Sequence, residues 1–144
     1  MATLLHLAFR VKNPVQSAAL YADLLDGRVV DLGGPLDSLG AKGVAFGRNG
    51  EDELVDLLEL WPWDKQWTPG GVVDVHPPCP ALGHFAVRSD APHEKLVAMA
   101  RKHGVPLSME ERGLPYLVPV IYDHDGNFVE VFPLEPGRSG RGPR

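Results

Sequence analysis

The sequence predicts an α+β protein made of two repeated β-α-β-β-β units. Short apolar segments with alternating polarity, which are typical of strands, lie at 4–11 and 82–88. A segment with helical spacing of apolar residues follows each of them, and three more strand-like segments follow each helix. The motif His-x-Ala-x-Arg-x-x-x-Pro also occurs twice, beginning at His6 and at His84. A repeat of this kind indicates one supersecondary unit used twice.

The first unit begins with a strand whose alternation places His6 and Arg10 on one face. Asn13 followed by Pro14 is typical of a helix start, because Asn caps free backbone N–H groups and Pro suits the first helical position. The other elements expected in this unit are, in order, a helix with Val15, Ala18, Ala19 and Leu25 at helical spacing and Gly27 at its end, a strand at 28–32, a loop at 33–40, a strand at 43–48 and a strand at 53–60 that carries Glu59.

The second unit follows a long connection at 61–80 that contains all three tryptophans. A connection of this length without secondary structure is usually functional or a linker. The elements expected after it are, in order, a strand at 82–88 carrying His84, a helix capped by Ser89 or Asp90 and ending at Gly104, a strand at 105–109, a polar turn at 110–115, a strand at 117–122, a tight turn at 123–126 and a strand at 127–132 carrying Glu130.

The length of 144 residues suits one domain, and we expect it to span residues 1–134. Module one would cover about 3–60, the linker 61–80 and module two about 81–134. The segment 135–144 is rich in Gly, Pro and Arg, which is typical of a disordered tail.

Composition excludes several classes of function. The net charge is −5, whereas nucleic-acid binding needs clustered basic residues. A single cysteine, Cys79, cannot form an internal disulfide and fits a reducing compartment. The sequence contains neither an apolar run of the ~20 residues that a membrane span needs nor the pattern of a signal peptide. We therefore expect a cytoplasmic protein that binds neither nucleic acid nor membrane.

Four residues on predicted strands carry the candidate chemistry: His6, Glu59, His84 and Glu130. A carboxylate on an inward strand face is costly unless it is paired or bound to a cation. Any one of the four alone is explained equally well by a hydrogen bond or by solvent. Their symmetric placement in a repeat instead predicts one shared site for a divalent ion such as Zn²⁺, Ni²⁺, Co²⁺, Fe²⁺ or Mn²⁺.

Segments around these four residues resemble the vicinal oxygen chelate superfamily, which includes glyoxalase I, extradiol dioxygenases and bleomycin-resistance proteins. The resemblance covers about residues 4–133 and rests on four segments, namely Leu5–Val11, Leu58–Leu60, Gly83–Val87 and Asp123–Glu130. It implies curved mixed sheets that enclose a metal-binding cleft. His124 occupies a turn position where the family has Pro, so the sequence has an additional histidine whose role is left open. His76, His93 and His103 are expected to be solvated.

The resemblance also implies roles for individual residues. His6, Glu59, His84 and Glu130 match the glyoxalase I ligand set, with Glu130 or Glu59 as the general base that removes a proton next to a carbonyl. Arg10 is similar to a substrate-contacting arginine, although its place in the repeat also allows a structural role. The candidates for lining the substrate pocket are the aromatic residues Trp61, Trp63, Trp67 and Tyr122, and packing or a dimer contact explains the tryptophans equally well.

The function expected from these residues is that of a metal-dependent lyase or isomerase of the glyoxalase type, which chelates neighbouring oxygens of a small substrate and stabilises an enediolate-like intermediate. Two alternatives stay open. An Fe(II) extradiol dioxygenase would lack Glu59, and a drug-sequestering resistance protein would need no metal. Members of the family commonly pair their modules, so a homodimer is expected, with each site built within one chain or across two.

Overall fold

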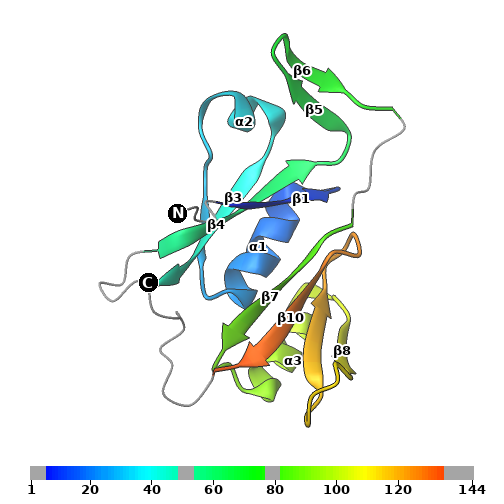
Figure 1. Cartoon of the computed structure of the whole chain (residues 1–144). Helices are drawn as coiled ribbons and strands as arrows, with labels where there is room; N and C mark the ends of the chain where they lie inside the picture. Colours follow the sequence, from blue (N-terminus) through cyan, green and yellow to red (C-terminus); the bar gives the residue numbers. More distant parts are fainter. Residues whose placement is uncertain (1–5, 49–53, 77–81, 135–144) are drawn as a thin grey trace. The chain divides into compact units, whose positions relative to one another are not determined.

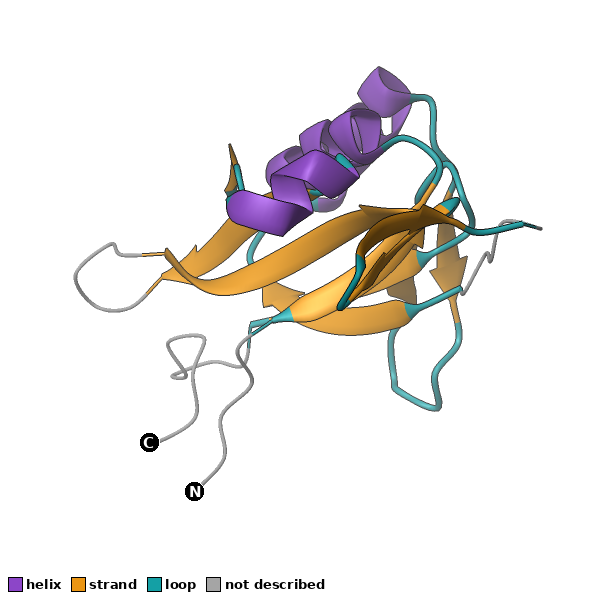
Figure 2. Ribbon diagram, turned by 90° about the horizontal axis from the view of Figure 1, so that it is seen from above, coloured by secondary structure: helices purple, strands orange, loops and turns teal. Residues whose placement is uncertain are grey.

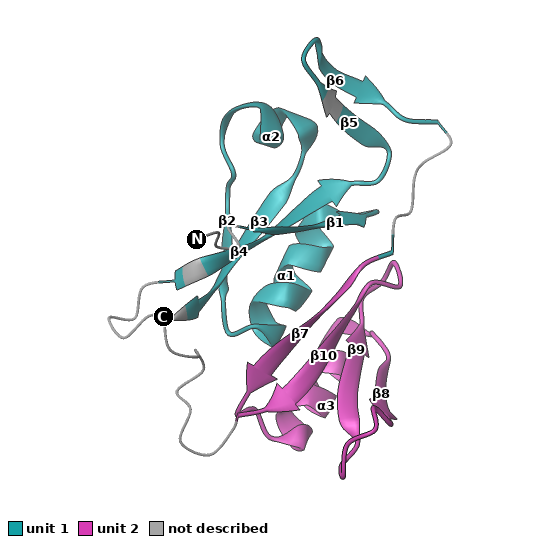
Figure 3. Cartoon of the chain, viewed as in Figure 1, with its two compact units in different colours: residues 1–82 teal, residues 83–144 magenta. Residues whose placement is uncertain are grey.

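The computed structural model describes residues 6–48, 54–76 and 82–134 (Figure 1). The chain divides into two compact units, residues 1–82 and 83–144 (Figure 3). In each unit a four-stranded sheet is joined to a long helix, and Figure 2 shows the helices lying along the sheets.

The first unit contains six strands and two helices within its described residues. Its main sheet has the order β1-β4-β3-β2, in which β1 and β4 are parallel and the other pairs are antiparallel. The elements are β1 (Leu7–Val11), α1 (Pro14–Leu24), β2 (Arg28–Val30), α2 (Gly34–Leu39), β3 (Lys42–Arg48), β4 (Leu54–Pro62), β5 (Lys65–Thr68) and β6 (Gly71–Asp74).

The second unit has the same connectivity. Its sheet has the order β7-β10-β9-β8, with β7 and β10 parallel and the other pairs antiparallel. The elements are β7 (His84–Ser89), α3 (His93–His103), β8 (Leu107–Glu110), β9 (Val118–Tyr122) and β10 (Phe128–Pro133). The two predicted β-α-β-β-β units are therefore present, and the predicted α+β class is confirmed.

Alternation along the central strand of the first sheet separates its core from its polar face. Leu58 and Leu60 of β4 are fully buried and pair with Leu7 and Phe9 of β1. Phe9 packs against Tyr21 of α1, with ring centroids 5.8 Å apart. Because successive strand residues point to opposite faces, Glu59 lies on the face opposite this core.

The apolar side of α1 differs from the predicted one. Ala18 and Leu24 are buried as the helical spacing requires, but Val15 is 65% exposed and Ala19 is also exposed. The buried side instead includes Ser17 and Leu20. A helix with apolar residues on several sides leaves the buried direction open, and the position of the sheet decides it. The predicted Asn13 cap is confirmed, since its side chain accepts a hydrogen bond from the Gln16 N–H.

Two segments expected to lack secondary structure contain some. The predicted loop at 33–40 holds α2, which begins with Gly34–Pro35 and ends at Gly40 in the left-handed conformation. The predicted connection at 61–80 holds the end of β4 and the hairpin β5–β6, which lies beside α2 (Figure 1). Thr68-Pro69-Gly70-Gly71 forms the turn, a sequence with strong turn residues that also explains the hairpin. Residues 77–81, including Cys79, lie outside the described residues.

Helix α3, in the second unit, begins later than expected. Its cap is Pro92 and not Ser89 or Asp90, and the Ser89 hydroxyl accepts a hydrogen bond from the Ala91 N–H within the preceding turn. The end at Gly104 is as predicted, with a left-handed backbone at φ +64°. Among the described residues, no helix has the length and apolar character needed to cross a membrane.

Candidate metal-binding half-sites

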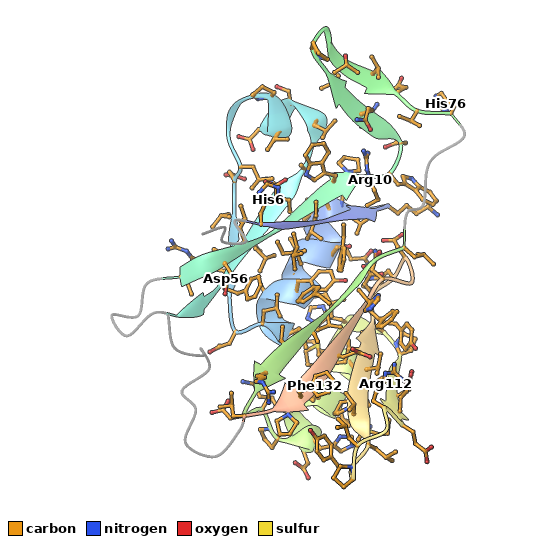
Figure 4. The ribbon with its side chains drawn as sticks, in the orientation of Figure 1. His6, Arg10, Asp56, His76, Arg112 and Phe132 are labelled. Atoms are coloured by element: carbon orange, nitrogen blue, oxygen red, sulfur yellow. The ribbon has the colours of Figure 1, made fainter. Side chains whose placement is uncertain are left out.

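The first half-site consists of His6 and Glu59 (His6 is labelled in Figure 4). Glu59 lies in the middle of β4, between β1 and β3, and is only 6% exposed. Its Oε2 accepts a hydrogen bond of 2.8 Å from the Trp61 indole N–H, and its Oε1 lies 3.8 Å from Nδ1 of His6. The His6 imidazole is half exposed, so the half-site combines a buried carboxylate with an accessible imidazole.

The second half-site consists of His84 and Glu130. His84 is exposed and its ring stacks on Phe128, with centroids 4.7 Å apart. The Glu130 side chain is 16% exposed, and its Oε1 accepts a hydrogen bond of 2.6 Å from Nε of Arg112. The Glu130 carboxylate therefore has a charged partner from its own unit, whereas Glu59 has a neutral N–H donor and a histidine.

The register of the sheets gives both half-sites the same construction. Ala8, two residues after His6, pairs with Glu59 across β1 and β4. Ala86, two residues after His84, pairs with Glu130 across β7 and β10. Paired residues of neighbouring strands share a sheet face, and so do residues two apart in one strand. The glutamates thus occupy equivalent positions, although they lie at different distances in sequence from their histidines.

The arginines of the repeat also occupy equivalent positions. Nη1 of Arg10 donates to the carbonyls of Pro62 and Lys65, and Nη1 of Arg88 donates to the carbonyl of Pro133. In sequence, these prolines end two similar segments, Glu59-Leu60-Trp61-Pro62 and Glu130-Val131-Phe132-Pro133. The shared bond fastens the first strand of each unit to the end of the strand that runs parallel to it, which is β4 in the first unit and β10 in the second.

Arg10 makes further contacts beyond those of Arg88. Its Nη2 donates to Oε1 of Gln66 at 2.6 Å, and its guanidinium lies 5.5 Å from the centre of the Trp61 ring. These contacts tie the β5–β6 hairpin to β1 (Figure 4). They give Arg10 a structural role within the first unit, and its predicted contact with substrate stays a prediction.

The turn before β10 has a structural explanation. Asp123 accepts hydrogen bonds from the N–H groups of Asp125 and Asn127 and from the Asn127 amide. Oδ1 of Asn127 accepts a bond of 2.8 Å from the N–H of Gly83, the residue before His84. The fully buried Asn127 side chain therefore joins the starts of β7 and β10 and positions both strands of the second half-site.

Sequence reasoning missed a polar network on β8 and β9. Glu110 accepts hydrogen bonds from the hydroxyls of Ser108 and Tyr122, and its Oε2 lies 2.7 Å from Nη2 of Arg112. These hydroxyls and the guanidinium lower the pKa of Glu110 from 4.5 to about 2. The same bond to Glu110 raises the pKa of Tyr122. In the sequence, Glu110 and Arg112 are only two charged residues in a predicted turn. Their spacing does not show that Glu110 contacts Tyr122 of β9.

This network predicts a pH dependence of stability. The folded-state pKa of Glu110 lies below its ordinary value of 4.5, so its contribution is complete above pH 4.5 and is lost as the pH falls toward 2. We expect the free energy of unfolding, measured in urea between about pH 6 and about pH 2, to fall less with decreasing pH in Glu110→Gln than in the wild type. Parallel curves for the two proteins would contradict this role of Glu110.

The remaining predicted site residues have partners within their own units. The Trp63 ring lies 5.1 Å from Nζ of Lys12, and Tyr122 packs near Phe128, with centroids 5.5 Å apart. Nε2 of His124 lies 2.9 Å from the carbonyl oxygen of His103, at the far end of α3. The side chain of Trp67 lies outside the described residues. The predicted role of Trp61, Trp63 and Tyr122 in lining a substrate pocket stays a prediction.

The donors of the two half-sites are chemically suited to a divalent cation. Each supplies one imidazole and one carboxylate on one sheet face, and Zn²⁺ and related ions bind both groups. Among the described residues, no three His, Cys, Asp or Glu side chains form a ready metal cluster. Within its described residues, each unit therefore brings together only one imidazole and one carboxylate at these positions.

Comparison with known proteins identifies the fold. No family model and no curated protein sequence matches the chain. Lactoylglutathione lyase from Agrobacterium tumefaciens superposes with a TM-score of 0.58 at 20% identity, over 92% of this chain and 94% of that one. The fosfomycin resistance protein FosX from Mesorhizobium loti gives 0.58 at 17% identity, over 91% of both chains.

An antibiotic-binding protein from Streptomyces sp. CB03234 is similar to the same extent. It has a TM-score of 0.58 and 16% identity, over 94% of this chain and 98% of that one. A lyase, a resistance protein and an antibiotic-binding protein thus share the architecture of this chain, so the architecture alone does not assign an activity. The repeated units and these likenesses together show that the chain has the fold of the vicinal oxygen chelate superfamily.

Proposed function

We propose that the two half-sites together bind one divalent cation, and that the protein is a metal-dependent lyase or isomerase of the glyoxalase type. The observation that supports this most is the shared register of His6 with Glu59 and of His84 with Glu130. Neither a solvent-facing role nor a local hydrogen bond requires both glutamates to occupy the same position relative to a histidine. A common ligand does require it.

When bound, such a cation supplies Lewis-acid stabilisation of negative charge on two neighbouring substrate oxygens. The residues of the chain have separate tasks in this proposal. The imidazoles of His6 and His84 are accessible nitrogen donors, and the two carboxylates supply charge. Glu59 or Glu130 also removes the proton next to a substrate carbonyl. The partly buried indole N–H of Trp61 holds Oε2 of Glu59, which suits a ligand of fixed orientation.

The small-molecule substrate, the cytoplasmic location and the homodimer belong to this proposal as well. The similar proteins include a lactoylglutathione lyase, so thiol adducts of small carbonyl compounds are the first substrates to assay. Ligands for one ion come from one chain or from two chains of a dimer. Sedimentation of the protein with and without bound cation distinguishes these arrangements.

A second candidate function is sequestration of a small molecule without catalysis. The observation that favours it is the ion pair between Arg112 and Glu130, which neutralises the carboxylate without a metal. The similarity to an antibiotic-binding protein is compatible with it. This candidate predicts no tight cation binding at the half-sites, so one titration separates the two functions.

The test is a titration of the untagged full-length protein, stripped with a chelator, with Zn²⁺, Ni²⁺, Mn²⁺ and Fe²⁺ by calorimetry. Glu59→Ala and His84→Ala are expected to weaken binding at least about 10-fold, the loss typical for a metal-site residue. His124→Ala is the matched histidine control and is expected to bind as the wild type does. Absence of binding to the wild type would favour the sequestering function.

Tryptophan emission provides an independent reading of the same titration. The Trp61 N–H donates to Glu59, so a cation that takes up this carboxylate changes the surroundings of the indole. Addition of Zn²⁺ is expected to change the emission of the wild type and of Trp63→Phe, but not that of Trp61→Phe. If the change disappears in Trp63→Phe and persists in Trp61→Phe, the ion is bound away from Glu59.

A further inference from the structure

Arg112, which is labelled in Figure 4, bridges two carboxylates of the second unit. Its Nε donates to Oε1 of Glu130 at 2.6 Å, and its Nη2 lies 2.7 Å from Oε2 of Glu110. The third nitrogen, Nη1, donates to the carbonyl of Glu111. The guanidinium is therefore fixed on every side by oxygen acceptors. Its planar fork suits such a position between two carboxylates.

The bond to Glu130 involves a proposed metal ligand. A divalent cation that binds this carboxylate uses the same oxygen lone pairs as the guanidinium and the same negative charge. The two cations therefore compete, and the free energy of the ion pair is subtracted from the free energy of metal binding. The first half-site has no such competitor among its described contacts, because Trp61 gives Glu59 a neutral N–H.

Glu110 already pairs with Arg112 and keeps this ion pair when a cation takes up Glu130. The hydroxyls of Ser108 and Tyr122 hold Oε1 of Glu110, so this carboxylate stays in place for the guanidinium. Arg112 itself lies in the connection 111–117, where every residue is exposed and none belongs to a helix or strand. A side chain from such a connection can change its partners with little loss of packing.

We propose that Arg112 is a built-in counter-ion of Glu130, and that an incoming divalent cation displaces it from Glu130 while Glu110 keeps hold of it. This inference rests on the proposed metal site and adds a residue that sets its affinity. Arg112 holds the Glu130 carboxylate in place while the site lacks a cation, and it lowers cation affinity at the second half-site. It is a positioning residue, since it acts on the site through Glu130.

The experiment measures cation affinity in the full-length, chelator-stripped protein with Zn²⁺ as the probe. Arg112→Gln removes the competitor and is expected to lower the Kd by about fivefold, the size typical of a partly exposed ion pair. Glu110→Gln removes the carboxylate that keeps hold of Arg112 and is expected to raise the Kd. A general loss of stability does not explain a lower Kd in Arg112→Gln together with a higher Kd in Glu110→Gln.

Two control variants separate competition from net charge. Arg101→Gln on α3 changes the charge as Arg112→Gln does, and Glu111→Gln changes it as Glu110→Gln does. Both are expected to retain the Kd of the wild type. A change in Arg101→Gln equal to that in Arg112→Gln would overturn the proposal. If Arg112→Gln and the wild type bind Zn²⁺ with the same affinity, the proposal about Arg112 is overturned and the metal site is not. If neither protein binds Zn²⁺, the proposed metal site is overturned as well.

The Nε–H resonance of Arg112 gives a readout that does not depend on folding of the Arg112 variant. In the cation-free protein it is expected to shift in Glu130→Gln, because its acceptor changes from a carboxylate to an amide. Addition of Zn²⁺ to the wild type is expected to shift it too. A resonance that is unaffected by saturating Zn²⁺ would show that the guanidinium is not displaced.

Discussion

Replacing Asn127 by alanine is expected to lower the free energy of unfolding by about 3 kcal/mol, because it removes the hydrogen bonds that this fully buried amide makes to Gly83 and Asp123. The Asn127 side chain is fully buried, accepts from the N–H of Gly83 and donates to Asp123. Alanine supplies neither bond, and the groups left behind lie where β7 and β10 begin. Urea unfolding followed by circular dichroism measures the loss.

Asn13→Ala is the matched control for this substitution. Asn13 is an exposed helix cap that also makes one side-chain bond, to the N–H of Gln16. Loss of such a cap costs about 1 kcal/mol. If Asn127→Ala costs no more than Asn13→Ala, the buried bonds do not hold the strands together. In the expected case, the second half-site also loses cation affinity, because His84 follows directly after Gly83.

The repeat explains why most of the fold was predictable from one sequence. His6 and His84 head the same motif, so each weak strand or helix signal in one unit is supported by its counterpart in the other. The fold class and the order of the repeated elements follow from this agreement. The repeat did not indicate α2 and the β5–β6 hairpin, because they have no counterpart among the described residues of the second unit, 83–134. Only local turn residues indicated them.

The candidate site was predictable in its residues and not in their partners. Period-2 alternation places Glu59 and Glu130 opposite the apolar core residues of their strands, so the sequence indicates their face. Register depends on pairing between distant strands, and only the structure shows that both glutamates pair with an alanine after a histidine. For the same reason the sequence did not predict the contact between Arg112 and Glu130, which depends on how β9 pairs with β10.

The end of α1 shows a similar limit at the level of the backbone. Gly27 stands where a left-handed glycine commonly ends a helix, yet the left-handed residue is Asp26, at φ +50°. Gly27 is required for space. A Cβ at this position would lie 2.5 Å from the carbonyl oxygen of Ala45 and 3.1 Å from Cβ of Phe46. Both belong to β3, whose Ala45 pairs with Arg28 of β2.

Gly27→Ala is therefore expected to destabilise the first unit by about 2 kcal/mol, within the range for overpacking. The obstructing atom belongs to the backbone of a paired strand, so it moves only if the pairing of β2 and β3 is disturbed. Urea unfolding measures the loss of free energy, and amide exchange in β2 and β3 is expected to locate it.

Two glycines separate the effect of space from that of backbone conformation. Gly104 has φ +64° with no atom within 4 Å of an added Cβ, so Gly104→Ala carries conformational strain alone, about 1 kcal/mol. Gly70 has a contact of 3.8 Å and no left-handed φ, so Gly70→Ala is expected to stay within about 0.5 kcal/mol of the wild type. The expected order of loss is Gly27→Ala, then Gly104→Ala, then Gly70→Ala. If Gly27→Ala lowers the free energy of unfolding no more than Gly70→Ala does, then β3 moves to accommodate the added methyl group. The close approach of residue 27 to this strand would then not require glycine.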